Sequence, residues 1–269
     1  MSVARAYAKI NLALVVGPPR GDAKHEVATV LQRIDLHDDV ALESAASLEI
    51  RGFAEDTLVR AALEGIGDAA HVPPHWRVRI VKRIPVAAGL GGGSSDAATA
   101  LVLANATLVE PLPPICLHPI AAGIGADVPF FLREHPQLAT GDGTMLREVA
   151  LPSGYVVLLV LPVAAVKDST RTVYERFDEH DGAQGFGERR AALERALAEV
   201  GSARDLSHLP RNDLAASPLS QRLEELGAFR ADVSGAGPIV YGLFEDGVLA
   251  TRAREELRSL GKTWLARPL

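Results

Sequence analysis

The segment from Pro85 to Ala98 reads Pro-Val-Ala-Ala-Gly-Leu-Gly-Gly-Gly-Ser-Ser-Asp-Ala-Ala and holds four glycines. Before it, residues 76–84 alternate apolar and basic side chains, which is typical of a half-buried strand. After it, residues 96–105 are rich in Ala and Leu, which favours a helix. We therefore expect a strand, a glycine loop and a helix. Ser94 or Ser95 is the expected N-cap, because a serine hydroxyl can accept a hydrogen bond from a free amide of the first turn.

A glycine loop that opens a helix suits an anion. Glycine lets backbone amides approach closely and adopt positive φ, and the helix start adds free N–H groups and the positive end of the dipole. We predict a phosphate site; the alternative is a tight structural turn, for which one or two glycines would be enough. The dinucleotide pattern G-x-G-x-x-G is not met, since Ser94 or Asp96 stands where its last glycine would be. A dinucleotide oxidoreductase is therefore disfavoured.

Composition bounds the remaining choices. The 269 residues are enough for two domains, and 48% of them are hydrophobic, unlike a disordered chain. The formal charge is −6 with acidic and basic residues mixed, whereas a nucleic-acid surface needs a basic stripe. Cys116 is the only cysteine, so no intrachain disulfide can form, and we expect it to be a buried structural thiol. With neither a signal peptide nor an apolar run long enough to span a membrane, the sequence favours a cytoplasmic protein.

Two polar features interrupt apolar segments in the first half of the chain. In the predicted strand Arg5–Val16, Lys9 and Asn11 project from the same face, which is either solvent-exposed or functional. Asp127 is the one charge in the apolar segment 121–132, where it is either a helix cap or a functional carboxylate.

Local patterns also predict several turns and a domain change. We expect a strand over His25–Leu36, a turn at His37–Asp39 and a hairpin turn at Gly141–Gly143. From about residue 150 the pattern becomes α+β, with domains expected at 1–150 and 151–269. In the second half we expect an apolar strand over 155–162, helices over 169–178, 188–200, 212–226 and 248–260, a second glycine turn within 231–244, and a last strand over 263–269.

Three segments together resemble the motifs of the GHMP small-molecule kinases. They are Tyr7–Leu12, Pro85–Ala98 and Val233–Pro238, and Gly125–Phe131 is similar to a further pattern of one branch of that family. The resemblance covers nearly the whole chain. It implies an α+β, two-domain GHMP kinase fold, with an N-terminal ATP-binding domain like domain 2 of ribosomal protein S5 and a ferredoxin-like C-terminal domain.

The resemblance also implies an activity. It is the ATP-dependent phosphorylation of the 2-hydroxyl of cytidine-diphospho-methylerythritol, in the non-mevalonate route to isoprenoid precursors, with ATP and Mg²⁺ as cofactors. The expected partner is this small molecule, with no nucleic acid and no membrane, and the protein is expected to be a monomer or homodimer. Two alternatives stay open: another GHMP kinase of the homoserine or mevalonate type, and a non-catalytic nucleotide or metabolite sensor on the same fold.

The resemblance assigns roles to residues that match the family's motifs. Asp127 takes or orients the proton of the attacking hydroxyl, and Lys9 stabilises charge on the transferred phosphoryl group. Ser95 matches a serine that binds magnesium in some relatives. The implied nucleotide-binding residues are Lys82, Pro85, Gly89, Leu90, Gly91, Gly92, Gly93, Ser94, Ser95, Gly235 and Gly237. The implied substrate-binding residues are Asn11, His25, Thr170 and Tyr174, the tyrosine stacking on the base.

The chain departs from the family's pattern at four positions. Lys24 stands where a tyrosine usually covers the other face of the cytosine, so stacking is expected on one side only. Thr57 replaces an asparagine near the adenosine, Thr144 replaces a glutamate after the predicted hairpin turn, and Ala236 replaces a serine of the third motif. The Lys24 departure is the best argument for a different alcohol substrate.

Overall fold

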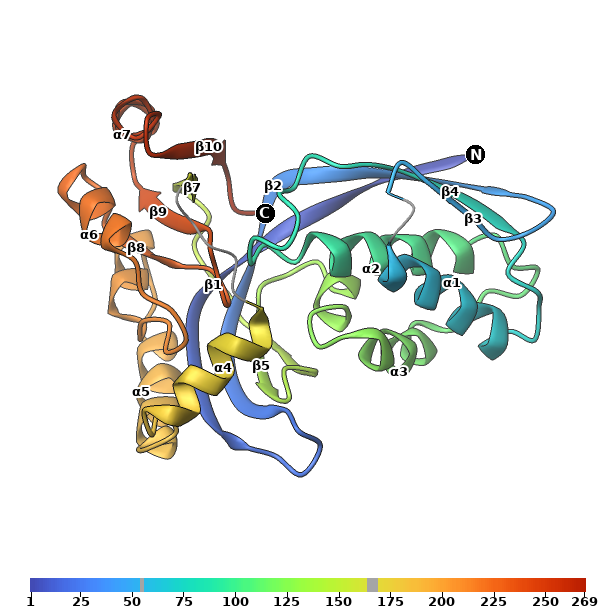
Figure 1. Ribbon diagram of the computed structural model, residues 1–269, viewed down its shortest axis with the longest axis horizontal. Coiled ribbons are helices and arrows are strands. Elements are labelled where there is room, and N and C mark those ends of the chain that lie inside the picture. Colours follow the sequence, from blue (N-terminus) through green and yellow to red (C-terminus); the bar gives the residue numbers. More distant parts are fainter. Residues whose placement is uncertain (54–55, 164–168) are drawn as a thin grey trace. The chain divides into compact units, whose positions relative to one another are not determined.

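The computed structural model describes residues 1–53, 56–163 and 169–269, and the chain folds into two compact units (Figure 1). The first unit consists of Met1–Ala8, Leu36–Ala87 and Gly91–Glu134. The second unit consists of Lys9–Asp35, Ala88–Leu90 and His135–Leu269. Because these segments alternate along the sequence, each unit draws on distant parts of the chain. The boundary expected near residue 150 stays a prediction.

The first unit packs three helices with a small sheet. Its strands include the C-terminal part of β2 (His25–Ser44), which pairs antiparallel with β4 (Trp76–Val81), and β3 (Glu49–Arg51), which pairs parallel with β4. Helix α1 (Thr57–Ala69) packs against α2 (Gly92–Asn105) and α3 (Pro114–Ile124), as Figure 1 shows. The short helix η1 (Pro129–Leu132) follows α3.

Local sequence explains these elements. In β4, Trp76, Val78 and Ile80 are buried while the residues between them are partly or fully exposed, which confirms the predicted alternation. Helix α1 starts after Asp56, whose carboxylate accepts hydrogen bonds from Leu58 N at 3.0 Å and from Val59 N at 2.9 Å.

The predicted turn at His37–Asp39 is wrong, because β2 continues through it. Asp38 is fully buried there, and its carboxylate accepts hydrogen bonds from the backbone amides of Arg83 and Ile84. These donors satisfy the buried carboxylate of Asp38. Two consecutive aspartates, which are typical of a turn, can therefore lie within a strand.

The second unit contains a four-stranded antiparallel sheet in the order β10-β7-β9-β8. Its strands are β7 (Val156–Pro162), β8 (Arg230–Val233), β9 (Val240–Phe244) and β10 (Gly261–Ala266). Helices α6 (Pro218–Glu225) and α7 (Gly247–Glu256) pack their apolar side chains against this sheet. Members of this core include Val156, Leu158, Val160, Leu223, Ala250, Ala253 and Leu257.

The rest of the second unit extends the long N-terminal strands. Residues of β1 (Ser2–Pro19) and the N-terminal part of β2 belong here, and β2 pairs with β5 (Gln137–Gly141). Strand β5 pairs antiparallel with β6 (Met145–Glu148), which confirms the predicted hairpin turn. The remaining elements are α4 (Thr170–Glu179), α5 (Phe186–Ala198) and η2 (Ala203–His208). Ser169 caps α4 by accepting a hydrogen bond from Thr172 N.

Two further expectations are wrong. The helix predicted over 212–226 begins only at Pro218, because proline suits the first turn but disfavours helix in the residue before it. Asn212 is instead held in a loop by its own side-chain hydrogen bonds. Cys116 is exposed, because it lies on the outer side of α3, a helix that the sequence patterns did not predict.

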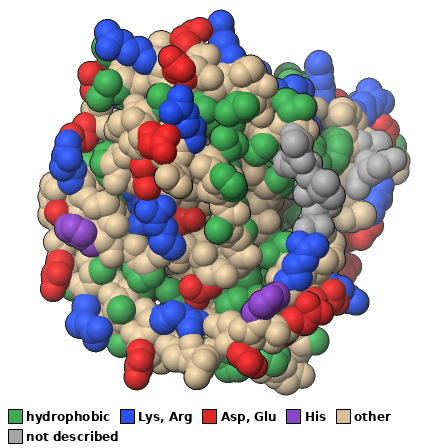
Figure 2. All heavy atoms as spheres, turned by 60° about the vertical axis from the view of Figure 1, so that its left-hand side comes forward, with side chains coloured by type: hydrophobic (Ala, Val, Ile, Leu, Met, Phe, Trp, Pro, Cys, Tyr) green, Lys and Arg blue, Asp and Glu red, His purple; other side chains and the backbone are tan. Residues whose placement is uncertain are grey.

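The surface agrees with the mixed charge of the sequence. Figure 2 shows acidic and basic side chains interspersed on the face that it presents. Within the part of the chain that the structure describes, none of the helices is long and apolar enough to cross a membrane.

Candidate active site

The glycine loop leads directly into α2, but the helix starts earlier than its serines suggest. The N-cap is Gly91, which has φ 68° and ψ 19°, and α2 begins at Gly92. The expected N-cap at Ser94 or Ser95 is therefore wrong: only glycine adopts this left-handed conformation without strain, so the helix can begin at once. No side chain among the described residues caps this end of α2, so its first amides remain available to an anion.

The residues just before this N-cap, Ala88–Leu90, belong to the second unit and are held within it. Three backbone oxygens of Ala88–Leu90 accept hydrogen bonds: from Ile239 N to Ala88 O at 3.2 Å, from Ser234 Oγ to Gly89 O at 2.9 Å, and from Lys9 N to Leu90 O at 3.0 Å. Gly89 has φ 87°, and a Cβ atom there would lie 2.0 Å from Ser234 O. The loop therefore needs glycine at this position both for its conformation and for the close approach of the third motif.

The third motif is a turn between β8 and β9. Gly235 and Gly237 both have positive φ, at 58° and 76°, as the two flanking glycines of the motif allow. Asn212 holds this turn, because its side-chain amide donates to Val233 O at 2.9 Å and to Gly235 O at 2.7 Å. Its carbonyl oxygen accepts from Leu214 N at 2.8 Å, so the whole side chain is engaged.

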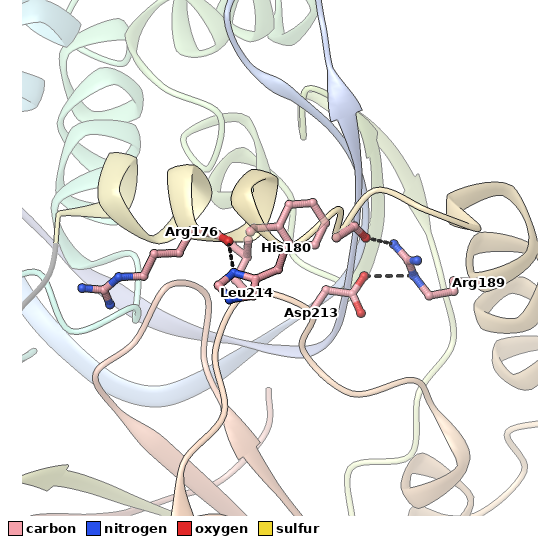
Figure 3. Close-up of a pocket in the computed structure, with 7 residues that line it drawn as sticks. Arg176, His180, Arg189, Asp213 and Leu214 are labelled. Carbon is pink, nitrogen blue, oxygen red and sulfur yellow. Dashed lines mark hydrogen bonds and ion pairs between the residues drawn. The ribbon is translucent and has the colours of Figure 1, made fainter.

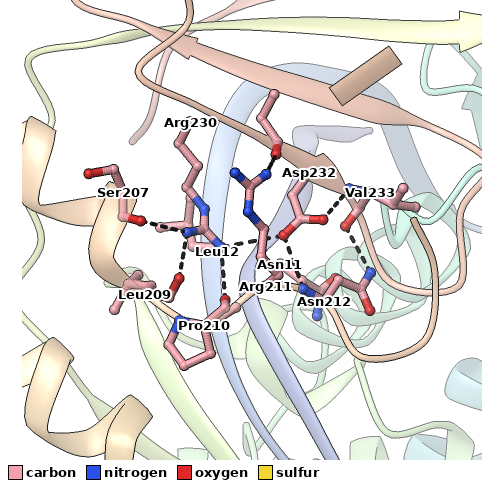
Figure 4. A network of polar contacts seen from close by, with 12 residues as sticks. Asn11, Leu12, Ser207, Leu209, Pro210, Arg211, Asn212, Arg230, Asp232 and Val233 are labelled. Carbon is pink, nitrogen blue, oxygen red and sulfur yellow. Dashed lines mark hydrogen bonds and ion pairs between the residues drawn. The ribbon is translucent and has the colours of Figure 1, made fainter. Parts of the chain in front are cut away.

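A buried arginine supports that turn from the other side (Figure 4). Arg230 is 1% exposed, and its guanidinium donates to Leu209 O at 2.6 Å and to Pro210 O at 2.8 Å. Asp232, 3.4 Å from Arg230 Nη2, accepts from Asn212 N at 3.0 Å. Burial raises the pKa of Asp232, while the charge of Arg230 opposes that shift. The network ties the loop that carries Asn212 to the strand that leads into the turn.

Lys9 lies in β1 with Asn11, and both are buried in the second unit. Lys9 is 3% exposed and its Nζ donates to Asn11 Oδ1 at 2.6 Å. Asn11 N donates to Ser234 Oγ at 3.3 Å. Of the two interpretations of this strand face, solvent exposure is therefore excluded. Lys9, Asn11 and the third motif lie together, with Leu90 and Gly89 beside them.

Lys82 lies in the first unit, between two buried carboxylates. Its Nζ is 2.6 Å from Asp38 Oδ2 and 2.6 Å from Asp96 Oδ2. Burial alone would lower the pKa of Lys82, but the two carboxylates raise it, so the ammonium stays charged. Burial raises the pKa of Asp96 to about 7 against the pull of Lys82. A Cβ on Gly92 would lie 3.4 Å from Lys82 Nζ, so the ammonium lies beside the start of α2.

The other expected nucleotide residues follow the loop into α2. Pro85 and Leu90 belong to the connection between β4 and α2, where Leu90 is 1% exposed. Gly93 and Ser94 are half-buried in the first turn of α2, and Ser95 is 1% exposed. Their roles stay predictions.

Asp127 belongs to the first unit and is half-buried between α3 and η1. The N-cap of η1 is Val128, so Asp127 is not the cap residue of that helix. The other interpretation, a functional carboxylate at Asp127, stays a prediction. Lys9 belongs to the second unit, and its pairing with Asp127 stays a prediction.

Two of the expected substrate residues of the second unit, His25 and Tyr174, lie side by side. The ring of His25 lies 4.6 Å from that of Tyr174, centroid to centroid, and its Nε2 is 2.9 Å from Asp178 Oδ1. His25 also meets the edge of Phe177 at 6.2 Å. Thr170 is exposed in the first turn of α4, one turn before Tyr174. The structure thus brings His25 and Tyr174 together.

The two departures at Lys24 and Thr144 meet at one carboxylate. Lys24 Nζ lies 2.5 Å from Asp142 Oδ2, and Thr144 Oγ1 donates to Asp142 Oδ1 at 2.6 Å. Burial alone would raise the pKa of Asp142, but the hydrogen bonds from Lys24 and Thr144 lower it to about 2. The lysine that replaces the expected tyrosine is therefore anchored on the turn between β5 and β6.

A pocket of about 360 Å³ lies beside the end of α4 (Figure 3). Its lining residues are Arg176, Phe177, His180, Gly182, Arg189, Asp213 and Leu214. Arg189 fixes one wall by donating to Val16 O and Gly182 O, both at 2.8 Å, and by its ion pair with Asp213 at 3.3 Å. The predicted substrate residues are not among those that line it.

Sequence reasoning missed four residues that hold this site together: Thr29, Asn212, Arg230 and Asp232. A signal existed for two of them. Arg230 and Asp232 are two apart in a short strand that enters a glycine turn, so their side chains share a face. Thr29 and Asn212 carried no such signal, because threonine is common in strands and asparagine in loops.

Comparison with known proteins defines the class. Residues 57–135 match the family model described as GHMP kinases N terminal domain, and residues 189–263 match that described as GHMP kinases C terminal. The chain therefore belongs to the GHMP kinases. The predicted family, the two-domain α+β fold class and the prediction of a small-molecule kinase are confirmed.

Individual relatives carry a more specific name. The chain is 36% identical to the 4-diphosphocytidyl-2-C-methyl-D-erythritol kinase of Syntrophotalea carbinolica, over 94% of this chain and 93% of that one. It is 32% identical to the kinase of the same name from Caldanaerobacter subterraneus, over 95% and 92%. A crystal structure of 4-(cytidine 5'-diphospho)-2C-methyl-D-erythritol kinase matches with a TM-score of 0.79 and 30% identity, covering 99% of both chains. A mevalonate kinase structure shares the fold, with a TM-score of 0.76 at 12% identity.

Proposed function

We propose that this protein transfers a phosphoryl group from ATP to the 2-hydroxyl of 4-diphosphocytidyl-2-C-methyl-D-erythritol. The observation that carries the proposal is identity of 30–36% to relatives named for this substrate, over more than nine-tenths of the chain. Membership of a kinase family implies ATP as the phosphate donor. The cytoplasmic location and the monomeric or homodimeric state stay predictions.

The described residues support separate roles in binding the triphosphate and in the chemistry at the 2-hydroxyl. Phosphoryl transfer depends on positioning and on charge stabilisation. The free amides at Gly91–Gly93 and the charge of Lys82 suit the triphosphate, and the turn at Gly235 and Gly237 supports the loop. Asp127 accepts or orients the proton of the 2-hydroxyl, and Lys9 stabilises the charge that moves with the phosphoryl group.

Magnesium fits the first turn of α2. Mg²⁺ prefers oxygen ligands and is commonly held by one or two protein groups together with substrate phosphates. Ser95 offers a hydroxyl there, and Asp96 Oδ1 is a buried carboxylate oxygen without a hydrogen-bond partner among the described residues. When bound, the ion would neutralise phosphate charge. The described residues contain no group of three or more His, Cys, Asp and Glu side chains suited to a metal, so the phosphates would supply the other ligands.

The base of the substrate is expected beside His25 and Tyr174. We expect Asn11 to meet the alcohol end, and its hydrogen bond with Lys9 supports this. Thr170, in the first turn of α4, is the fourth expected contact. Lys24 is the observation that favours a second candidate, another small alcohol, because its ion pair with Asp142 replaces an aromatic face by a charge.

The test is an ATP-dependent kinase assay with a small panel of alcohols. We expect turnover of 4-diphosphocytidyl-2-C-methyl-D-erythritol, and little with mevalonate or homoserine. Turnover of another member of the panel alone would replace the proposed substrate while keeping the class of enzyme. ATP binding without turnover of any alcohol would favour a sensor on the same fold.

A further inference from the structure

A chain of buried hydrogen bonds runs from the backbone of β1 to the ammonium of Lys9. Thr29 Oγ1 donates to Ala13 O at 2.7 Å, Asn11 Nδ2 donates to Thr29 Oγ1 at 2.8 Å, and Lys9 Nζ donates to Asn11 Oδ1 at 2.6 Å. Thr29 and Asn11 are each 5% exposed, Lys9 is 3% exposed and Ala13 is 1% exposed. All of them belong to the second unit, and water has little access to any link of the chain.

The direction of every hydrogen bond in this chain is determined by its two ends. A carbonyl oxygen can only accept, so Thr29 must give its single hydroxyl proton to Ala13 O. Toward Asn11 the hydroxyl can then only accept, and the amide must turn its NH₂ group to Thr29. The oxygen of that amide consequently faces Lys9, whose ammonium can only donate. The two ends agree, so the orientation of the Asn11 amide does not depend on an arbitrary choice between its oxygen and nitrogen.

Without the hydroxyl of Thr29 this orientation keeps only the anchor at its other end, where Lys9 Nζ at 2.6 Å and Ser234 Oγ at 3.4 Å donate to Asn11 Oδ1. The NH₂ group of Asn11 would face an apolar side chain in a buried place, where an unsatisfied donor is costly. A flipped amide would instead turn two N–H donors against the ammonium of Lys9. The flip removes the charge-assisted hydrogen bond that fixes where the ammonium points, and the unflipped amide leaves that bond without its buried support.

We propose that Thr29 is a positioning residue for phosphoryl transfer, which acts through Asn11 to aim Lys9. The proposal rests on the role of Lys9 in the proposed function. Thr29 itself touches neither Lys9 nor the nucleotide motifs through any hydrogen bond described above. Its effect is therefore expected on the chemical step and not on the binding of ATP.

The first test compares Thr29→Val with Thr29→Ser. Valine keeps the shape of the side chain and removes the hydroxyl, whereas serine keeps the hydroxyl and removes a methyl group. Because a hydrogen bond to a charged group is worth about 1.5–3 kcal/mol, we expect kcat to fall on the order of 10- to 100-fold in Thr29→Val, with the KM for ATP within about twofold. Thr29→Ser should keep kcat within about threefold of the wild type. A purely structural role would lower Tm in both variants and spare kcat per folded molecule.

The second test places both changes in an Asn11→Ala background. If Thr29 acts through Asn11, Thr29→Val should cause no further loss of kcat once Asn11 is gone. A further loss of similar size would overturn the proposal, as would wild-type kcat in Thr29→Val or an equal loss in Thr29→Ser. If Thr29→Val folds poorly, Thr29→Cys replaces it in the comparison, because cysteine is close to threonine in volume and its thiol is only a weak acceptor. A kcat of Thr29→Cys equal to that of Thr29→Ser would then overturn the proposal too. An inactive wild-type protein would instead refute the proposed function.

Discussion

The loop that begins at Ala88 and the surroundings of His25 are built from different chemistry. The loop is held through backbone oxygens, which accept from Lys9 N, Ser234 Oγ and Ile239 N. Around His25 the contacts described above are made by side chains, including the ring of Tyr174 and the carboxylate of Asp178. This backbone-built site tolerates few changes at Gly89, because a Cβ atom there would lie 2.0 Å from Ser234 O. A side-chain-built site can change its specificity by single substitutions, as at Lys24.

The largest effect is expected at Asp127, the proposed base. We expect Asp127→Asn to lower kcat by about 10²- to 10⁴-fold, the usual contribution of a general base, while ATP still binds. Steady-state kinetics and calorimetric titration with ATP measure the two quantities. Asp68→Asn, at an exposed position of α1, is the matched control and should behave like the wild type. Near-normal turnover of Asp127→Asn would remove it from the proposed mechanism.

The loop that begins at Ala88, which is held through its backbone, is tested by Gly89→Ala. A Cβ atom would lie 2.0 Å from Ser234 O at a residue with φ 87°, so the loop must shift. We expect the KM for ATP to rise about tenfold or more and the free energy of unfolding to fall by about 1–3 kcal/mol. Gly123→Ala is the control, because nothing lies within 4 Å of a Cβ placed there. If both variants bind ATP equally well, the loop is not as constrained as its contacts indicate.

The surroundings of His25, which are built from side chains, are tested by Tyr174→Ala. Stacking of a base on an aromatic ring contributes about 1–3 kcal/mol, so the KM for the cytidine substrate should rise about 5- to 150-fold, with the KM for ATP unchanged. Tyr174→Phe keeps the ring and should stay close to the wild type. An equal rise in KM for both substrates would show that the base does not bind at Tyr174. The two regions would then not divide ATP and cytidine binding between them.

The smallest effect is expected at Lys24. The Lys24–Asp142 pair is half exposed on the lysine side, and such pairs contribute about 0–1 kcal/mol, so Lys24→Tyr should barely change Tm at neutral pH. If the base lies beside this position, the new ring should lower the KM for the cytidine substrate severalfold. An unchanged KM would show that the base lies away from Lys24.

The pH dependence of that pair has a definite sign. Asp142 has a pKa of about 2 in the fold and an ordinary value of 3.8, so the pair stabilises the protein above about pH 4. That stabilisation disappears as the pH falls through 2. Any difference in Tm between the wild type and Lys24→Ala should therefore vanish at the acid end of a pH series measured by thermal unfolding.

The sequence predicted the elements around the glycine loop because they depend on local rules. The alternation in β4, the glycines and the alanine-rich α2 each follow from residues close in the chain. The N-cap was wrong because Gly91 could adopt a left-handed conformation that made the serine caps unnecessary. The turn at Asp38 and the helix at Asn212 were wrong because both side chains are engaged by residues far away in the sequence.

The residues of the candidate site could be predicted where they belong to a sequence motif. Lys9, Asn11 and the glycines of the third motif lie together in the second unit as expected. For Arg230 the spacing from Asp232 gave the only signal. The importance of Thr29 comes from burial and from the direction of hydrogen bonds. Neither property is visible in a sequence pattern.

The alternation of segments between the units has a consequence for dividing the protein. A fragment that stopped after residue 150 would retain every segment of the first unit. It would nevertheless lack Ser234 and Ile239, which donate to Gly89 O and Ala88 O. In such a fragment the loop at Ala88–Leu90 would lose two of its three hydrogen bonds. Adding the missing C-terminal fragment would be needed to restore them. The halves of this chain are thus better suited to a complementation assay than to separate expression.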